Sequence, residues 1–209
     1  MVCKVLAGET QEYWGVCYNF GQFGKIEKRN KESKKCQTTE DDNMMRNSKI
    51  SYVRTGEGFD YLCRIRDVFT NTVLAQCSAK TMKAELVVST LKAVQNKWYL
   101  AEDVIFHSDR GSQYTAQSVT KQVASYGWRQ SFSRVGKPGD NSWSESFFSI
   151  LKKEIIHWLF YKTRGEARQR IFEYIEVFYN CQRAQKRLGY LSPIQYLKQW
   201  QKRQLTEIA

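Results

Sequence analysis

Three stretches with strand character follow one another between residues 49 and 79, and this succession limits the possible folds more than any other feature. "KISYV" (49–53) alternates in polarity, "DYLCRIRDVF" (60–69) follows a glycine-containing turn, and "NTVLAQCSA" (71–79) is mostly apolar. Short runs rich in β-branched and aromatic residues, bounded by turn residues, are typical of strands. The sequence therefore predicts an antiparallel meander here.

An alternation of helices and strands follows the meander. Leu86, Val87, Thr90, Leu91 and Val94 recur at helical spacing, which predicts a helix with one buried face. Three strands followed by this alternation predict an α/β fold, a mixed five-stranded sheet flanked by helices. We expect helices within residues 82–98, 116–127, 142–156, 163–185 and 192–201, and strands at 103–109 and 128–133.

The long helical segment near the C-terminus has a pattern of its own. Within residues 163–185, Ile171, Ile175 and Phe178 recur at helical spacing, so we expect all three in the core. Gly189 comes just after this helix, where a positive φ angle is least unfavourable for glycine.

The first 44 residues differ in composition from the rest. "GKIEKRNKESKKCQTTEDDN" is nearly all polar, with charge runs of both signs, and it predicts a solvated arm or linker. We therefore divide the 209 residues into a divergent, poorly defined N-terminal arm (1–44), a core with C-terminal helices (45–198) and a tail (199–209).

The charge balance favours a polyanionic partner. Lys and Arg number 33 against 21 Asp and Glu, which gives a formal net charge of +12, and such an excess favours nucleic acid. The six cysteines have no C-x-x-C spacing, which argues against a zinc finger and for a reducing, cytoplasmic compartment. No apolar run of about 18 residues exists, so we expect no membrane span.

Two carboxylates are placed where a chemical site could form. Asp109 ends the strand "DVIFHSD", and Glu145 lies in the first turns of the helix that begins near Ser142. Carboxylate oxygens are the ligands that Mg²⁺ and Mn²⁺ prefer, and a pair of such ions can drive phosphodiester displacement. The structural alternatives are a turn-forming Asp and a Glu that only complements the helix dipole.

Four segments in order carry a family resemblance. "YVRTGEGFDYLCRIRDVFTNTVLAQCSAKTMKAELV", "HSDRGSQYTA", "SFSRVGKPGDNSWSESFFSILKKE" and "YIEVFYNCQRAQKRLGYLSPIQYL" together resemble the orfB-type catalytic subunit of bacterial insertion-sequence transposases, which has a retroviral-integrase-like core. The resemblance covers roughly residues 43–197.

The resemblance implies an RNase H-like fold and a DDE active site that cleaves and joins DNA strands with two Mg²⁺ or Mn²⁺ ions. It matches Asp109 to the family's second catalytic Asp and Glu145 to its catalytic Glu, so both are candidate catalytic residues and metal ligands. Implied partners are DNA, as element ends and target, further copies of the chain, and a separate helix-turn-helix protein. The implied location is the bacterial cytoplasm, at the nucleoid when the protein is bound to DNA.

One segment departs from the family pattern. Members carry Trp, two further residues and then "D-I-T-Y-I", whose Asp is the first catalytic carboxylate. Here the corresponding run is "RNSKISYV", with Arg46 in place of the Trp and Lys49 in place of the Asp. A second departure is Gln185, where the family has His. An ammonium group cannot ligate a metal and repels one.

This departure leaves several interpretations open. The chain is an active transposase, a catalytically dead relative that binds DNA, or the product of a degraded gene copy, and it holds two metal ions, one or none. The acids that could replace the first Asp are Glu40, Asp41, Asp42, Glu57, Asp60 and Asp67.

Several residues near the two carboxylates are candidates for DNA contact. Basic side chains would bind phosphates, and aromatic rings would stack on an unpaired base, with a solvated surface and core packing as the respective alternatives. His107, two residues before Asp109, either orients the site or packs. The DNA-binding candidates are Lys152, Lys153, Arg134, Lys137, Tyr114 and Trp143.

Overall fold

The computed structural model divides the chain into two compact units, Met1–Asp41 and Asp42–Ala209. In the first, β1 (Val2–Val5) pairs antiparallel with β2 (Tyr13–Val16). All other described elements, together with Lys49, Asp109 and Glu145, belong to the second unit. The structure describes residues 2–5, 13–16, 45–98, 102–134 and 142–208.

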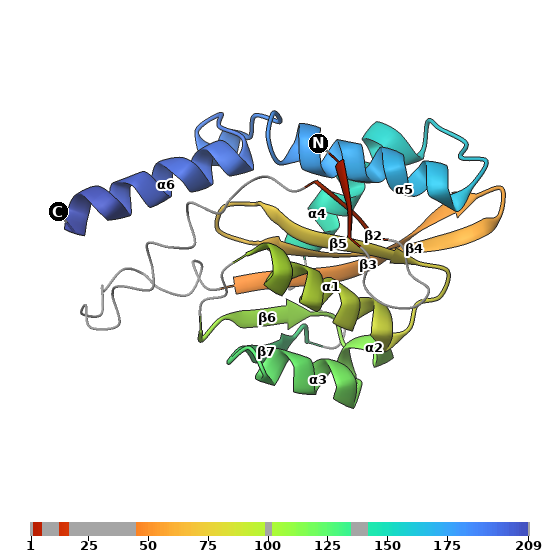
Figure 1. The fold of residues 1–209 in the computed structure, drawn as a ribbon, viewed down its shortest axis with the longest axis horizontal. Coiled ribbons are helices and arrows are strands. Elements are labelled where there is room, and N and C mark those ends of the chain that lie inside the picture. The colour runs from red at the N-terminus through yellow and green to blue at the C-terminus, as the bar shows by residue number, and fades with distance from the viewer. Residues whose placement is uncertain (1, 6–12, 17–44, 99–101, 135–141, 209) are drawn as a thin grey trace. The chain divides into compact units, whose positions relative to one another are not determined.

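The second unit is built on a mixed sheet with the strand order β5-β4-β3-β6-β7 (Figure 1). β3 (Met45–Thr55), β4 (Gly58–Asp67) and β5 (Val73–Ala79) form the predicted antiparallel meander. β6 (Ile105–Ser108) adds parallel to β3, and β7 (Arg129–Phe132) adds parallel to β6. The predicted mixed five-stranded sheet is confirmed.

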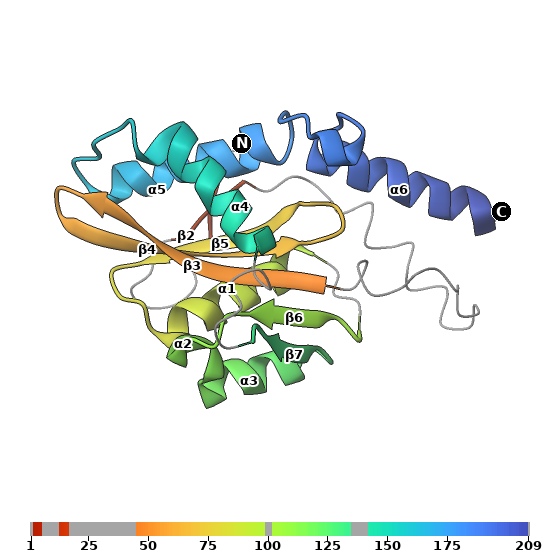
Figure 2. The ribbon, with the colours of Figure 1, turned by 180° about the vertical axis from the view of Figure 1, so that it is seen from behind.

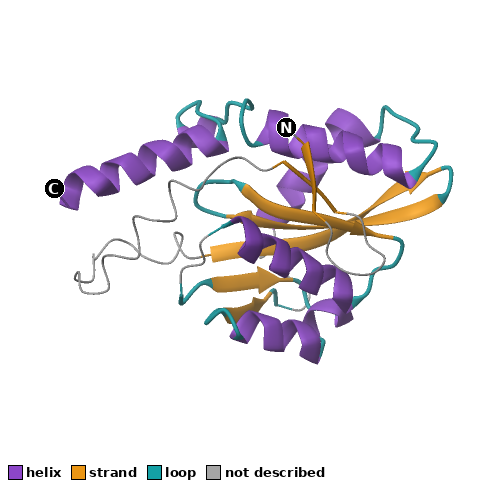
Figure 3. Cartoon of the chain, viewed as in Figure 1, coloured by secondary structure: helices purple, strands orange, loops and turns teal. Residues whose placement is uncertain are grey.

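Helices cover both faces of this sheet. α1 lies in front of the sheet in Figure 1, whereas α4 lies in front of it in Figure 2, the view from behind. Figure 3 shows the strands of the sheet in orange and the helices packed around it in purple. The helices are α1 (Ala84–Lys97), α2 (Ser112–Thr115), α3 (Gln117–Ala124), α4 (Ser142–Leu151), α5 (Arg164–Glu173) and α6 (Pro193–Ile208).

β3 begins four residues before the predicted strand. Met45, Arg46 and Asn47 pair in parallel with the first residues of β6, which extends the strand backwards through a polar stretch. The polar side chains are satisfied there: Asn47 Oδ1 accepts a hydrogen bond from Arg64 Nη1 (2.9 Å), and Arg46 pairs with Asp67 on β4. The polar sequence of this stretch gives no sign of a strand, because the residues that pair with it are distant in the sequence.

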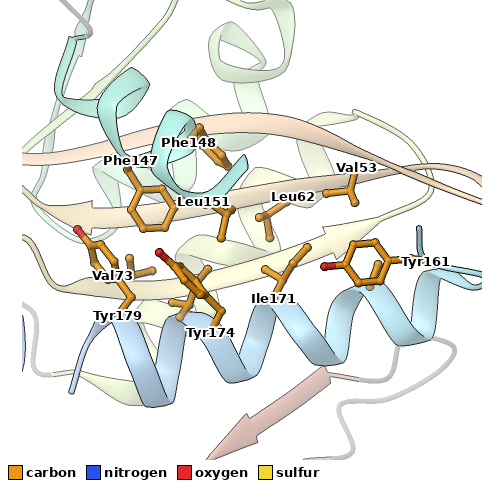
Figure 4. Packing of buried hydrophobic residues seen from close by; sticks show 12 residues of the cluster. Val53, Leu62, Val73, Phe147, Phe148, Leu151, Tyr161, Ile171, Tyr174 and Tyr179 are labelled. Carbon is orange, nitrogen blue, oxygen red and sulfur yellow. The ribbon is translucent and has the colours of Figure 1, made fainter. Parts of the chain in front are cut away.

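The apolar core lies between the sheet and the helices α4 and α5. Figure 4 shows side chains from the strands and from both helices pointing toward one another. On the opposite face, α1 buries the five residues that helical spacing predicts. The core cluster next to α4 and α5 consists of Val53, Leu62, Val73, Phe147, Phe148, Leu151, Tyr161, Ala167, Ile171, Tyr174, Ile175 and Tyr179.

α4 and α5 both continue into a wider, π-type turn, labelled η4 (Lys152–Ile156) and η5 (Tyr174–Tyr179). Such a turn bonds each residue to the fifth one along, so the buried face shifts relative to an α-helix. Phe178 is 40% exposed as a result, and Tyr179 is buried in its place. The prediction that Phe178 lies in the core is therefore wrong.

Candidate active site between β3, β6 and α4

Asp109 lies directly after β6, at the carboxyl end of a strand that runs parallel to both of its neighbours. Its Oδ1 accepts a hydrogen bond from the backbone N–H of Gly111 (3.1 Å), and the residue is half-buried. This end of a parallel strand is where open α/β sheets usually bind ligands. Asp109 thus has the strand-end position that the sequence predicts.

Lys49 lies on the neighbouring strand at nearly the same height. β3 and β6 pair in parallel with Asn47 opposite His107, and the same register continued by two residues aligns Lys49 with Asp109. Residues two apart on a strand point to the same face. Lys49 therefore shares a face with Asn47, on the side of the sheet that α4 covers.

Glu145 reaches this face from the first turn of α4. Its Oε1 accepts a hydrogen bond from Lys49 Nζ at 3.1 Å, and the two groups form an ion pair. The Lys49 side chain is 24% exposed and that of Glu145 is 50% exposed. The contact joins residues 96 positions apart in the sequence. The fold thus brings Lys49, which stands where the family has its first Asp, against the candidate catalytic residue Glu145.

A second cation lies beside Lys49. Arg64 is its cross-strand partner on β4 and is fully buried. The Arg64 guanidinium packs over the ring of Phe147 (4.4 Å to the centroid) and near that of Phe148 (5.1 Å), both on α4. Burial, together with the charge of the nearby Arg66, lowers the pKa of Arg64 well below its usual range.

The comparisons with known proteins identify the family. A family described as "Integrase core domain" matches residues 45–138, and a second family of the same description matches residues 145–200. This chain belongs to the integrase-core family. The RNase H-like core expected for such proteins agrees with two solved structures. The catalytic core domain of BIV integrase has a TM-score of 0.56 at 14% identity, covering 77% of this chain and 98% of that one. The Mos1 transposase catalytic domain has a TM-score of 0.54 at 16% identity, covering 65% and 72%.

Proteins of insertion sequences are similar to this chain in sequence. The chain is 36% identical over 149 residues to the transposase of IS904 from Lactococcus lactis. It is 37% identical to an uncharacterized 31 kDa protein of IS600 from Shigella sonnei, and 35% identical to transposase InsF of IS3A from Escherichia coli. These matches cover 71%, 72% and 70% of this chain, but only 59%, 56% and 51% of the relatives. The chain thus corresponds to a little over half of each relative.

The side chains at this point of the integrase core do not fit a pair of divalent metal ions. The family normally uses such ions, and the Mos1 transposase catalytic domain has been solved with Mn. Here the Lys49 ammonium contacts the Glu145 carboxylate, and Arg64 adds a buried positive charge nearby. Among the residues that the structure describes, no group of three or more His, Cys, Asp or Glu side chains could hold a metal ion.

The other acids of the integrase core have partners elsewhere. Asp60 is buried and accepts two hydrogen bonds from Arg168, at 2.9 and 2.6 Å. Asp67 pairs with Arg46 and also accepts a hydrogen bond from the backbone N–H of Thr70 (2.8 Å).

At the tip of the β3–β4 hairpin, Glu57 Oε2 accepts a hydrogen bond from the backbone N–H of Arg164 (2.9 Å). None of these three replaces the first Asp in the described structure, and the remaining candidates, Glu40, Asp41 and Asp42, lie outside the described residues.

Lys152 and Lys153 follow Glu145 on the same continuous helix, about 10 Å further along its axis. The Lys152 ammonium lies 5.0 Å from the centre of the Tyr52 ring, and Lys153 is exposed. Arg134 is exposed just after β7. Lys137 and the side chain of Trp143 lie outside the described residues. Lys152, Lys153 and Arg134 therefore remain candidates for phosphate contact.

Tyr114 has no face available to a base. It is fully buried, and its hydroxyl is hydrogen-bonded to Ser48 Oγ (2.9 Å). Burial also raises the pKa of Tyr114 well above its usual range. Tyr114 is therefore a residue of the core and not a DNA contact.

His107 contacts Ser131 Oγ (3.1 Å) and Ser133 Oγ (3.2 Å) through its two ring nitrogens. These contacts hold β6 against β7 and against Ser133, just beyond the end of β7.

Gln185, the second departure from the family pattern, accepts a hydrogen bond from Asn71 Nδ2 (2.9 Å). This bond joins the C-terminal segment to the β4–β5 turn.

The helices within the described residues include none with the length and hydropathy of a membrane span.

Proposed function

We propose that this chain is an integrase core of DNA transposition that binds DNA, and that Lys49 prevents the metal-dependent cleavage and transfer of DNA strands. The single observation that carries this proposal is the contact of 3.1 Å between Lys49 Nζ and Glu145 Oε1. The transposase relatives support the choice of DNA as the substrate.

The charge at the site explains the expected loss of activity. A divalent ion held by carboxylates supplies an activated water and stabilises the leaving oxygen of a phosphodiester. Asp109 and Glu145 are the candidates to hold such an ion, but Glu145 is already neutralised by an ammonium group. Lys49 gives the site one positive charge, half that of a divalent ion, and none of the ion's coordination chemistry.

DNA binding does not need the missing acid. The net charge of +12 favours phosphate contacts, and we assign these to Lys152, Lys153, Arg134 and Lys137, with Trp143 as a stacking candidate. The affinity should fall steeply as salt rises, because each phosphate contact releases a condensed counterion. A salt-independent affinity contradicts this part of the proposal.

The wider setting follows the insertion-sequence relatives. We propose that the chain forms oligomers with further copies of itself, works with a separate helix-turn-helix protein, and resides at the bacterial nucleoid in the cytoplasm. Light scattering of the protein with and without DNA tests the oligomers. Co-purification of the protein encoded beside it in the element tests the partner.

Cleavage of a labelled DNA end in Mn²⁺ tests the proposal directly. We expect no cleavage by the wild-type protein. The Lys49→Asp variant should cleave, because it restores a third carboxylate beside Asp109 and Glu145. The double variant Lys49→Asp/Glu145→Gln should lose that gain.

Two outcomes contradict the proposal. Cleavage by the wild-type protein that disappears in Glu145→Gln shows that the site works despite Lys49. Failure of the wild-type protein to bind DNA removes the DNA-binding function itself. A non-cooperative thermal transition of the wild-type protein would instead favour the product of a degraded gene copy, although the continuous core argues for a folded protein.

A further inference from the structure

Two exposed aromatic rings lie side by side on the β3–β4 hairpin. Tyr52 on β3 is 56% exposed and Phe59 on β4 is 48% exposed. Their ring centres are 5.3 Å apart and the planes are nearly perpendicular, at 76°. Single exposed aromatic residues are common, but two in contact present a larger exposed aromatic surface than either ring alone.

Positive charge surrounds this pair. The Lys152 ammonium lies 5.0 Å from the centre of the Tyr52 ring. Arg54 is exposed and pairs directly with Phe59 across the hairpin, so its side chain shares a face with both rings. Aromatic rings flanked by Lys and Arg are the arrangement by which proteins bind single-stranded nucleic acid.

The rings lie further along β3 than Lys49, on the other face of the sheet. Tyr52 is three residues beyond Lys49, about 10 Å along the strand, and this odd separation turns its side chain away from the face that α4 covers. Lys152 is seven residues beyond Glu145 on its helix, also about 10 Å. Because Lys49 contacts Glu145 and Lys152 contacts Tyr52, the strand and the helix run alongside each other over this span.

We propose that Tyr52 and Phe59, with Lys152 and Arg54 beside them, form a stacking site for an unpaired base of a DNA strand. The inference rests on the DNA binding proposed above and adds a preference for frayed or single-stranded ends.

Fluorescence anisotropy with two DNA probes tests the stacking site. One probe is a blunt duplex, and the other is the same duplex with an unpaired 3′ extension of about five nucleotides. We expect the wild-type protein to bind the extended probe about 5-fold to 150-fold more tightly, the range that base–aromatic stacking supplies. Tyr52→Leu/Phe59→Leu should remove this preference and leave the affinity for the blunt probe within about twofold.

Three variants act as controls. Phe178→Leu changes a ring of similar exposure, 40%, on η5 and should leave the preference intact. Tyr52→Trp keeps an aromatic face and should retain the preference, which guards against a folding defect in the leucine variant. Lys152→Ala should weaken binding of both probes and reduce the slope of the salt dependence by about one.

The position of the stacked base has its own readout. A 2-aminopurine placed in turn at each extension nucleotide should lose fluorescence on binding at one or two positions, and only when Tyr52 or Tyr52→Trp is present. If the leucine variant keeps the wild-type preference, or weakens both probes equally, the stacking site is refuted while DNA binding stands. If the wild-type protein binds neither probe, both proposals fail.

Discussion

Replacing Lys49 by Asp should create a binding site for a divalent metal ion. The residues Lys49, Asp109 and Glu145 together carry one net negative charge, and the substitution raises this to three. At an effective dielectric constant of about 20, an ammonium group and a divalent ion about 4 Å apart repel each other by about 8 kcal/mol. In a water-like environment the repulsion falls to about 2 kcal/mol.

The exposure of the pair, 24% for Lys49 and 50% for Glu145, places the site between these limits. Removing the repulsion by the smaller amount alone corresponds to about 30-fold in affinity. We therefore expect Lys49→Asp to bind Mn²⁺ at least about 30-fold more tightly than the wild-type protein in isothermal titration calorimetry.

Lys153→Asp is the matched control, because it makes the same change of charge at an exposed position further along the helix. It should gain little affinity for Mn²⁺. If Lys49→Asp gains none, or if Lys153→Asp gains as much, then Lys49 does not occupy the position of a metal ligand and the reasoning about the site is refuted.

Three further predictions concern stability and reactivity. Arg168→Ala removes the guanidinium that donates two hydrogen bonds to the buried Asp60 carboxylate. It should lower the free energy of unfolding in urea by about 3 kcal/mol, because it leaves a buried charge unpaired. Leu151→Ala empties part of the core and should lower it by about 2–5 kcal/mol, whereas Leu159→Ala at an exposed position should change it by less than about 0.5 kcal/mol. Burial raises the pKa of the Cys77 thiol to about 12, so a thiol reagent at pH 8 should leave Cys77 unmodified in the native protein. Because the native state favours the protonated thiol, the stability that this group contributes should be lost as pH rises from about 9 toward 12. Modification of native Cys77 at the rate seen in urea contradicts the last prediction.

The sheet and the first helix could be predicted because their signals are local. The meander from residue 49 onward and the buried face of α1 follow from apolar spacing within each segment. The start of β3 could not be predicted in this way. Arg46 and Asn47 look like loop residues until Asp67 and Arg64 are placed opposite them by the fold.

The candidate site was partly predictable from sequence. The acids Asp109 and Glu145 and the unexpected Lys49 could be named, but no sequence pattern shows that Lys49 and Glu145 make contact across 96 positions. Arg64 carried no signal at all, since an Arg in a strand is normally exposed. It is buried here because two aromatic rings of α4 cover it and Asn47 accepts its hydrogen bond.

The contact between Lys49 and Glu145 also bears on how rigid the protein is in a chelating buffer. This ion pair holds the start of α4 against β3, the central strand of the sheet, without the help of a metal ion. The backbone amides of that helix should therefore exchange with deuterium at the same rate with and without EDTA, whereas a helix anchored only through a bound ion would loosen when the ion is withdrawn.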